Sequence, residues 1–345
     1  MTTKFHQILN VRDTSQIGEA RRAAIAIGQE LGLNEVAIGR VALVATELAA
    51  NLAKHAQQGQ LLIGSVMSTD GNEMVEVLSI DHGPGISDLS ACMVDGYSTS
   101  GTSGTGLGAI RRLSNEFDLF SEHPGGTVIL SRVGQSRVND AAPTLSVNPP
   151  HFVFGAIALA APGETVCGDA WAVNQHEKNA LAFVADGLGH GPVAGEAAVA
   201  AMEVFCAAAI NTSPSKIIEK AHAALRATRG AAVAIAQLNA EENVIIFSGA
   251  GNIAARLISG IEDRSLVSQH GTVGAQIRRL QDDRYPWPQF TLLIMHSDGV
   301  NTRWNLEKSG GLLQRHPSII AAWLIRDHCR GRDDATILVI KRRGA

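Results

Sequence analysis

Glu47 and Asn51 stand four residues apart in an apolar, alanine-rich segment, and Lys54 follows three positions later. Residues at these spacings share one face of an α-helix. A carboxylate, an amide oxygen and an amine on one face can position a nucleophile, a Mg²⁺ ion and a phosphate group. Taken alone, the same pattern also describes the solvated face of an amphipathic helix, so its meaning depends on the rest of the chain.

A second group begins where an apolar run ending at Ile80 meets Asp81, Gly83 and Gly85. A carboxylate at a strand end can accept a hydrogen bond from an exocyclic amine such as that of adenine. The glycines allow the backbone to approach a flat ring closely. Alone, these residues would indicate an ordinary turn.

The segment 101–108 is rich in glycine and directly precedes a predicted helix. Backbone amides at the start of a helix form a cradle for anions such as phosphate. The spacing matches neither the dinucleotide-binding glycine pattern nor the P-loop, so the segment alone indicates only a flexible loop. The glycines that would form the cradle are Gly104, Gly106 and Gly108.

Acidic residues recur in the second half of the chain, each beside a glycine or a second aspartate. They are Asp169, Asp186, Asp298 and the pair Asp333 and Asp334. Three of these points stand at the ends of predicted strands, where short side chains can converge. Hard divalent cations prefer oxygen ligands, and two such ions can activate a water molecule for attack on a phosphate. Each aspartate alone would be explained by a turn.

The elements that would position the first group occupy the N-terminal part of the chain. Apolar periodicity predicts two helices between about 16 and 58, the first ending at Gly32 and the second starting after Asn34. Alternating runs predict strands over 61–67, 74–80, 117–122 and 127–133.

A polar stretch with three prolines, residues 136–150, predicts a linker between domains 1–135 and 151–345. Beyond it, strands are expected at 153–159, 180–185, 233–238, 244–248, 290–296 and 335–340, with helices over 193–210 and 215–227. Many strands with few interposed helices favour a layered α/β sandwich.

Composition limits the class of protein. The 345 residues are 45% hydrophobic and 18% charged with a net charge of −4, which disfavours nucleic acid as the main partner. The four cysteines form no CxxC pair, which fits a reducing compartment. We expect no apolar run near 18–20 residues and therefore no membrane segment, so the sequence predicts a cytoplasmic protein.

In combination, the three N-terminal groups resemble the N, G1 and G2 boxes of the GHKL ATPase superfamily over residues 10–133. The segments TELAANLAKHA and IDHGPGISDL look like RsbT-type anti-sigma-factor-like switch kinases. The resemblance implies a Bergerat α/β sandwich that binds ATP and Mg²⁺. It implies that Asn51 holds Mg²⁺ and that Glu47 is the base toward a protein serine or threonine. Asp81 would read adenine between Gly83 and Gly85, and Thr127 would support the adenine pocket. The phosphates would be wrapped by Gly104, Gly106 and Gly108. Lys54, on the helix face that it shares with Glu47 and Asn51, would lie near phosphate.

The C-terminal segments VADGLGHG, HSDGV and DDATILVI resemble the SpoIIE-like and RsbX-like branch of the PPM serine/threonine phosphatases over residues 152–341. The resemblance implies an α-β-β-α sandwich, so the whole chain would be of the α+β class, with two Mn²⁺ or Mg²⁺ ions. It implies that Asp186, Asp298 and Asp333 hold the metals, Gly187 offers its carbonyl, Asp169 completes the site directly or through water, and Asp334 and His190 support it. Contact with phosphate falls to the metals or to Arg229.

The two resemblances together imply a bifunctional enzyme in which Glu47, Asp186 and Asp298 are catalytic. Its substrate would be a STAS-type anti-anti-sigma or scaffold protein in a bacterial partner-switching pathway, with a downstream sigma-regulating phosphatase as a further partner and a homodimer as an expected assembly. The alternative is an anti-sigma-like sequestering module fused to an active phosphatase. Intact Glu47 favours the enzyme, since a pure binder needs no base.

Overall fold

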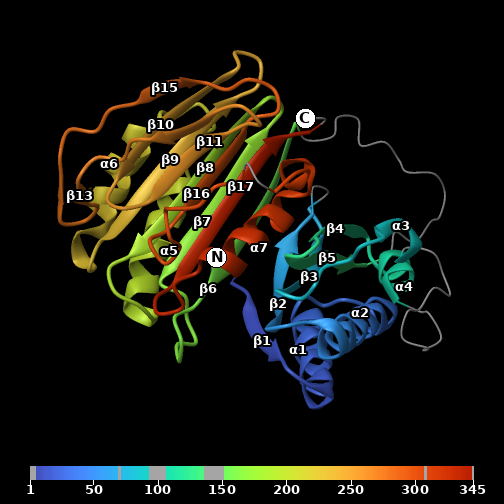
Figure 1. Ribbon diagram of the computed structural model, residues 1–345. Coiled ribbons are helices and arrows are strands. Elements are labelled where there is room, and N and C mark those ends of the chain that lie inside the picture. Colours follow the sequence, from blue (N-terminus) through green and yellow to red (C-terminus); the bar gives the residue numbers. More distant parts are fainter. Residues whose placement is uncertain (1–4, 69–70, 93–105, 136–150, 307–308, 344–345) are drawn as a thin grey trace. The chain divides into compact units, whose positions relative to one another are not determined.

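The computed structural model describes residues 5–68, 71–92, 106–135, 151–306 and 309–343 (Figure 1). The chain forms two compact units, one spanning His6–Leu145 and the other containing Ser146–Ala345. We call them the N-terminal and the C-terminal domain and treat each by itself. The predicted linker, 136–150, lies outside the described residues.

Five antiparallel strands form the sheet of the N-terminal domain, in the order β1-β2-β3-β5-β4. Its two central strands, β3 and β5, are nearly continuous runs of buried residues. The strands are β1 (Gln7–Val11), β2 (Gly59–Met67), β3 (Glu73–Asp81), β4 (Glu116–Glu122) and β5 (Gly126–Gly134).

Helices cover one face of this sheet (Figure 1). Asn34 caps the longest of them, because its side chain accepts a hydrogen bond of 2.9 Å from the backbone N–H of Ala37. The helices are η1 (Thr14–Gln16), α1 (Ile17–Glu30), α2 (Glu35–His55), α3 (Leu89–Cys92) and α4 (Gly106–Leu113).

Helix α2 corrects one expectation from the sequence. Over 18 of its 21 residues the mean hydropathy reaches 1.5, so by length and composition alone it is apolar enough to cross a membrane. Charged residues such as Arg40 and Glu47 interrupt this run without lowering its average much, so the sequence shows no continuous apolar stretch here. Its buried residues Val44 and Leu48 pack into the domain's own core, as in the core helix of a globular domain.

Two five-stranded sheets face each other in the C-terminal domain, and their facing side chains form one core. Along β8 (Asn179–Gly187), neighbouring side chains point to opposite faces of the sheet. Ala182 packs toward the opposite sheet, and Phe183 packs toward the helices on the outer side. The first sheet has the order β15-β10-β9-β8-β7 and the second has the order β12-β11-β16-β17-β6.

Helices lie on both outer sides of this sandwich, which gives four layers (Figure 1). Helices α5 and α6 pack on the first sheet, and α7 packs on β6 and β17 of the second. The elements are β6 (Phe152–Leu159), β7 (Asp169–His176), β8 (Asn179–Gly187), α5 (Pro192–Cys206), α6 (Pro214–Ala224), η2 (Leu225–Ala227), β9 (Ala231–Asn239), β10 (Val244–Ala250), β11 (Ala254–Ile258), β12 (Asp263–Leu266), β13 (Gly271–Thr272), β14 (Gln276–Ile277), β15 (Asp283–Pro286), β16 (Leu292–His296), η3 (Leu312–Gln314), α7 (Pro317–His328) and β17 (Ala335–Arg342).

Gly155 fixes how closely α7 approaches β6. A Cβ atom on Gly155 would lie 2.2 Å from the backbone nitrogen of Ser318 in the first turn of α7. We expect Gly155→Ala to destabilise the C-terminal domain by about 1–3 kcal/mol, because helix and strand would have to separate. Chemical unfolding followed by circular dichroism measures this change. Gly310→Ala is the control, since nothing lies within 4 Å of a Cβ there, and equal midpoints for the two variants would contradict the prediction.

An ionic cluster joins neighbouring strands of the N-terminal sheet. Glu76 contacts Arg132 Nε at 2.7 Å and His6 Nε2 at 3.0 Å, and Arg132 also reaches Glu116 at 2.8 Å. Burial alone would raise the pKa of Glu76, but the charge of Arg132 and the hydrogen bond from His6 lower it from 4.5 to about 2.

The lowered pKa makes the stability of the cluster depend on pH. Ionised Glu76 contributes stability above pH 4.5, and this contribution is lost as the pH falls toward about 2. We expect Glu76→Gln to lower the thermal midpoint at pH 6, and the gap to wild type to shrink progressively as the pH falls below 4.5. Scanning calorimetry between pH 3 and 6 tests this. Glu30→Gln, an exposed carboxylate, is the control, and a gap that does not change with pH would refute the role of the Glu76 charge.

Candidate active sites

Glu47 and Asn51 lie on the half-buried side of α2, and Lys54 is exposed near its end. Within the described residues, none of the three side chains makes a hydrogen bond or an ion pair. Helix α4 packs against α2, so its first residues lie on the same side of the sheet. The helix backbone therefore holds the predicted catalytic and metal-binding groups in place, and no side chain in the described part of the protein engages them.

The end of β3 places Asp81 beside Thr127. The two residues are direct partners in the β3–β5 register, so their side chains share a face of the sheet. This is the helix-covered face, since Val77 and Ile129 of the same alternation belong to the core under α2. The structure thus brings together the two residues predicted to surround adenine.

Short contacts shape the loop that follows Asp81. The backbone N–H of Gly83 donates to Asp81 Oδ1 at 2.6 Å, and the N–H of His82 donates to the carbonyl of Gln57 just after α2. Gly85 has a φ of +75°, and a Cβ there would lie 2.2 Å from the carbonyl oxygen of Glu122. Only glycine fits this position.

Ser121 is a residue that the sequence reasoning missed. Its hydroxyl lies 2.9 Å from the Thr127 hydroxyl and accepts a hydrogen bond of 2.7 Å from the N–H of Ile86. It therefore ties the glycine loop to the strand that carries Thr127. Nothing in its sequence neighbourhood marks it, because the link depends on the β4–β5 register.

The glycine-rich segment is described only in part. Gly104 lies outside the described residues, whereas Gly106 begins α4 and Gly108 is buried within it. The start of α4 therefore stands where the predicted phosphate cradle would end.

Asp169 and Asp186 face each other across β7 and β8 of the C-terminal domain. Asp169 is 1% exposed, and its Oδ2 accepts a hydrogen bond of 2.7 Å from the Ser297 hydroxyl. Its Oδ1 is buried without a hydrogen bond of normal geometry among the described residues, although the Thr336 hydroxyl lies close by. This oxygen is therefore available to a further ligand.

Asp298, Asp333 and Asp334 converge on the same end of the sandwich. Asn252 donates to Asp298 Oδ2 at 2.6 Å. The N–H of Asp334 donates to Asp333 Oδ1, and Asp334 Oδ1 accepts from the N–H of Ala161, both at 2.9 Å. Asp298 and Asp333 are half-buried, while Asp334 is buried.

The close carboxylates repel one another. Burial, followed by the charges of Asp298, Asp333 and Asp334, raises the pKa of Asp186 to about 7. Burial and the charge of Asp186 raise the pKa of Asp169 well above its ordinary value, and burial raises that of Asp334. Like charges this close favour the protonated form unless a cation intervenes.

The donor set fits hard divalent cations in its chemistry. All donors are oxygens, which suits Mg²⁺ or Mn²⁺, and bound cations would relieve the repulsion and engage the free oxygen of Asp169. The described ranges contain no group of three or more His, Cys, Asp or Glu side chains that is already close enough together to hold a metal ion. The carboxylates would therefore have to close around a bound ion.

Gly187 and His190 occupy the loop after β8. A Cβ on Gly187 would lie 2.1 Å from the carbonyl oxygen of Ala194, so α5 packs directly on this backbone. His190 Nδ1 lies 2.7 Å from Glu164 Oε1, which makes Glu164 a second residue that the sequence reasoning missed. This hydrogen bond holds His190 in the loop that follows Asp186.

Cys167 lies behind the aspartates. It is 1% exposed, and its thiol donates to the carbonyl of Leu159 at 3.4 Å. Burial, with the charges of Asp169 and Asp334, raises the pKa of this thiol strongly.

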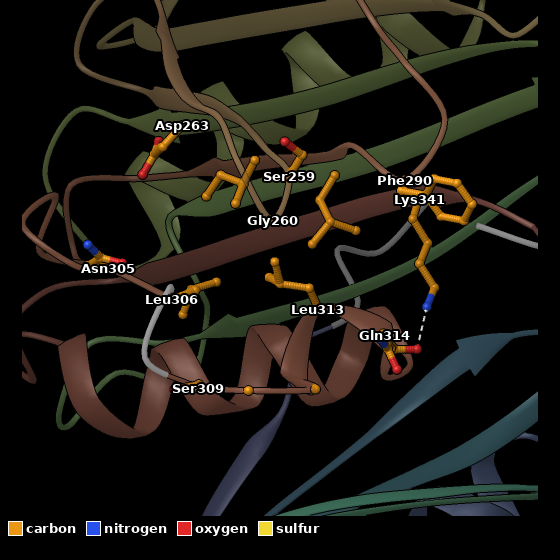
Figure 2. Close-up of a pocket in the computed structure, with 14 residues that line it drawn as sticks. Ser259, Gly260, Asp263, Phe290, Asn305, Leu306, Ser309, Leu313, Gln314 and Lys341 are labelled. Atoms are coloured by element: carbon orange, nitrogen blue, oxygen red, sulfur yellow. Dashed lines mark hydrogen bonds between the residues drawn. The ribbon is translucent and has the colours of Figure 1, made fainter.

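A separate cavity of about 370 Å³ lies between the β11–β12 turn and η3 (Figure 2). Ile258, Leu292, Leu306 and Leu313 supply apolar side chains, and Lys341 Nζ donates to the carbonyl of Gln314 at 2.9 Å. None of the predicted site residues lines it.

Comparison with known families assigns each domain. Residues 11–132 match the histidine kinase-like ATPase domain. Residues 176–343 match the stage II sporulation protein E family, SpoIIE. The GHKL α/β sandwich expected for the N-terminal domain and the PPM-type α-β-β-α sandwich expected for the C-terminal domain are confirmed.

Individual relatives agree with this division. The chain is 38% identical over 110 residues to the serine/threonine-protein kinase RsbT of Bacillus subtilis (strain 168), covering 82% of that protein and 32% of this chain. It is 27% identical over 140 residues to the phosphoserine phosphatase RsbX of the same organism, covering 70% of that protein and 40% of this chain. A solved structure described as "The bacterial stressosome: a modular system that has been adapted to control secondary messenger signaling" is 26% identical, with a TM-score of 0.51, and the match covers 55% of this chain and 99% of that chain. The chain therefore belongs to the RsbT-type serine/threonine kinase family through its N-terminal domain, which is fused to a SpoIIE-type domain similar to RsbX.

Proposed function

We propose that this chain both phosphorylates and dephosphorylates a serine or threonine of a STAS-type protein in a bacterial partner-switching pathway. The observation that carries the kinase half is the position of Glu47 and Asn51 on α2, against which α4 packs, with no partner for either side chain among the residues that the structure describes. The observation that carries the phosphatase half is the cluster of repelling aspartates at one end of the C-terminal sandwich.

In the proposed kinase reaction, the substrate hydroxyl oxygen attacks the γ-phosphorus of ATP and the bond to ADP breaks. Glu47 accepts the hydroxyl proton, and Asn51 holds the Mg²⁺ ion that ATP carries. Asp81 accepts a hydrogen bond from the adenine amine, supported by Thr127 and flanked by Gly83 and Gly85. Lys54 and the amides of Gly104, Gly106 and Gly108 contact the phosphates.

In the proposed phosphatase reaction, Asp169, Asp186, Asp298, Asp333 and the carbonyl of Gly187 hold two Mn²⁺ or Mg²⁺ ions. Such ions, when bound, supply an activated water and neutralise phosphate charge. The protein's part is to fix the carboxylates on strand ends, with Asp334 and His190 supporting the loops that carry them.

Partners and location follow from the same proposal. The substrate is a STAS-type anti-anti-sigma or scaffold protein, with a sigma-regulating phosphatase further along the pathway and a homodimer as the expected assembly. All four cysteines are free, which fits the cytoplasm. The competing function is a sequestering ATP-binding module fused to an active phosphatase.

Glu47→Ala separates these two functions. We expect ATP affinity to change little and phosphotransfer to a STAS protein to slow by about 10²–10⁴-fold, since the variant loses only a positioned base. Asn51→Ala should abolish Mg²⁺-dependent ATP binding, while both variants keep wild-type phosphatase activity. Calorimetry with ATP and labelling with radioactive ATP provide the measurements. Glu35→Ala, on the same helix, is the control. A wild-type protein that binds ATP but labels no STAS candidate would favour sequestration.

Asp186→Asn and Asp298→Asn test the phosphatase centre. We expect each to reduce Mn²⁺-dependent hydrolysis of p-nitrophenyl phosphate by more than about 100-fold, because even residues behind metal ligands commonly contribute 10–100-fold. Mn²⁺ binding should weaken by calorimetry, and a chelator should stop the wild-type reaction. Asp282→Asn is the control, since Asp282 accepts hydrogen bonds from Ser215 at the start of α6. An active double variant would exclude the metal assignment.

A further inference from the structure

Arg229 places an unpaired cation beside the loop that carries Asp186. Its side chain is exposed and makes no ion pair or hydrogen bond with any residue in the described parts of the chain. One guanidinium nitrogen, Nη1, lies 3.1 Å from where a Cβ of Gly189 would be. The guanidinium therefore lies against the bare backbone of Gly189, three residues after Asp186.

The turn that presents Arg229 is held by hydrogen bonds on both sides. The Thr228 hydroxyl donates to the carbonyl of Leu225 at 2.8 Å and accepts from the N–H of Gly230 at 3.0 Å. The N–H of Leu188 donates to the carbonyl of Gly230 at 3.0 Å, which joins this turn to the loop after Asp186. The backbone position of Arg229 is thus fixed relative to that loop.

The register of β8 and β9 places the turn that contains Arg229 at the acidic end of the sandwich. Asp186 and Gly187 on β8 pair directly with Ala232 and Ala231 on β9. Arg229 precedes Ala231 by two residues, so it leaves the sheet at the end where the aspartates gather.

We propose that Arg229 binds the phosphate group of the phosphoserine or phosphothreonine substrate, an inference that rests on the proposed phosphatase function. An arginine offers paired N–H donors that match two oxygens of a phosphate monoester, and it stays charged at any physiological pH. The aspartates cannot serve this purpose, because their charge repels the phosphate unless cations intervene. The Arg229 guanidinium, held against the loop that follows Asp186, supplies the missing attraction.

Two other exposed arginines, Arg330 and Arg332, stand near Asp333 in the sequence and compete for this role. The contact that places Arg330 near the acidic end is made by its backbone, whose N–H donates to the carbonyl of Gly299 at 2.8 Å. Arg229 is favoured because its guanidinium itself lies against the loop of Asp186.

The test uses the full chain with Mn²⁺, p-nitrophenyl phosphate as substrate and inorganic phosphate as competitive inhibitor. We expect Arg229→Ala to lower kcat/KM by about 10–100-fold, mainly through KM, and to raise the inhibition constant of phosphate by a similar factor. Arg229→Lys should recover part of the loss, because it keeps the charge without the paired donors. Mn²⁺ binding by calorimetry should stay unchanged. Arg226→Ala, an exposed arginine three residues earlier, is the matched control.

Unchanged phosphate inhibition in Arg229→Ala would overturn the proposal, as would a larger rise in Arg330→Ala or Arg332→Ala. If the wild-type protein hydrolysed no phosphate ester, the proposed phosphatase function would fail by itself. Calorimetry of inorganic phosphate binding to the Mn²⁺-loaded protein would then test whether Arg229 binds phosphate. Weaker binding to Arg229→Ala than to wild type would support this role, and equal binding would refute it.

Discussion

Repulsion among neighbouring carboxylates is the interaction on which the C-terminal domain depends. Asp169 and Asp186 are register partners on adjacent strands, so they cannot separate without breaking the sheet. Burying such charges is costly, and the rest of the sandwich has to offset that cost. The core does so with small side chains such as Ala182 and Ala234, which allow the facing sheets to pack closely, and with the stacked rings of Phe152 and Trp287. Ser297 then fixes one oxygen of Asp169 and leaves the other free.

The N-terminal domain uses a related arrangement for a different chemistry. Asp81 also ends a buried strand, but the backbone N–H of Gly83 and the neighbouring Thr127 surround it in place of other carboxylates. Its environment therefore favours accepting a hydrogen bond over binding a cation. In both domains a glycine follows the acidic residue within four positions, where neighbouring backbone lies too close for a side chain, as at Gly85 and Gly187.

Local signals in the sequence were sufficient for much of the fold. The cap at Asn34 and the apolar spacing of α2 placed that helix, and alternating strand-like runs located the strands β3, β8 and β9. The short strand β1, the mostly half-buried β7 and helix α7 were not predicted. Helix α7 is apolar on every side and so lacks the periodicity that reveals a surface helix.

Some residues of the candidate sites could also be predicted from the sequence, and others could not. Their acidic and glycine residues were found because type and spacing mark them within a few positions. Ser121, Glu164 and Asn252 were not, since each contacts a residue far away in the chain, respectively Ile86, His190 and Asp298. Such partners become visible only when the sheet order is known.

Cys167 has a consequence for redox chemistry. Only a thiolate reacts readily with peroxide or disulfides, and this thiol is both enclosed and surrounded by negative charge, so it stays protonated. The acidic centre also contains no sulfur nucleophile of its own among the described residues. An acidic centre that relies on oxygen donors beside an inert thiol offers peroxide no reactive sulfur, so it differs from enzyme centres that oxidation silences through a catalytic cysteine.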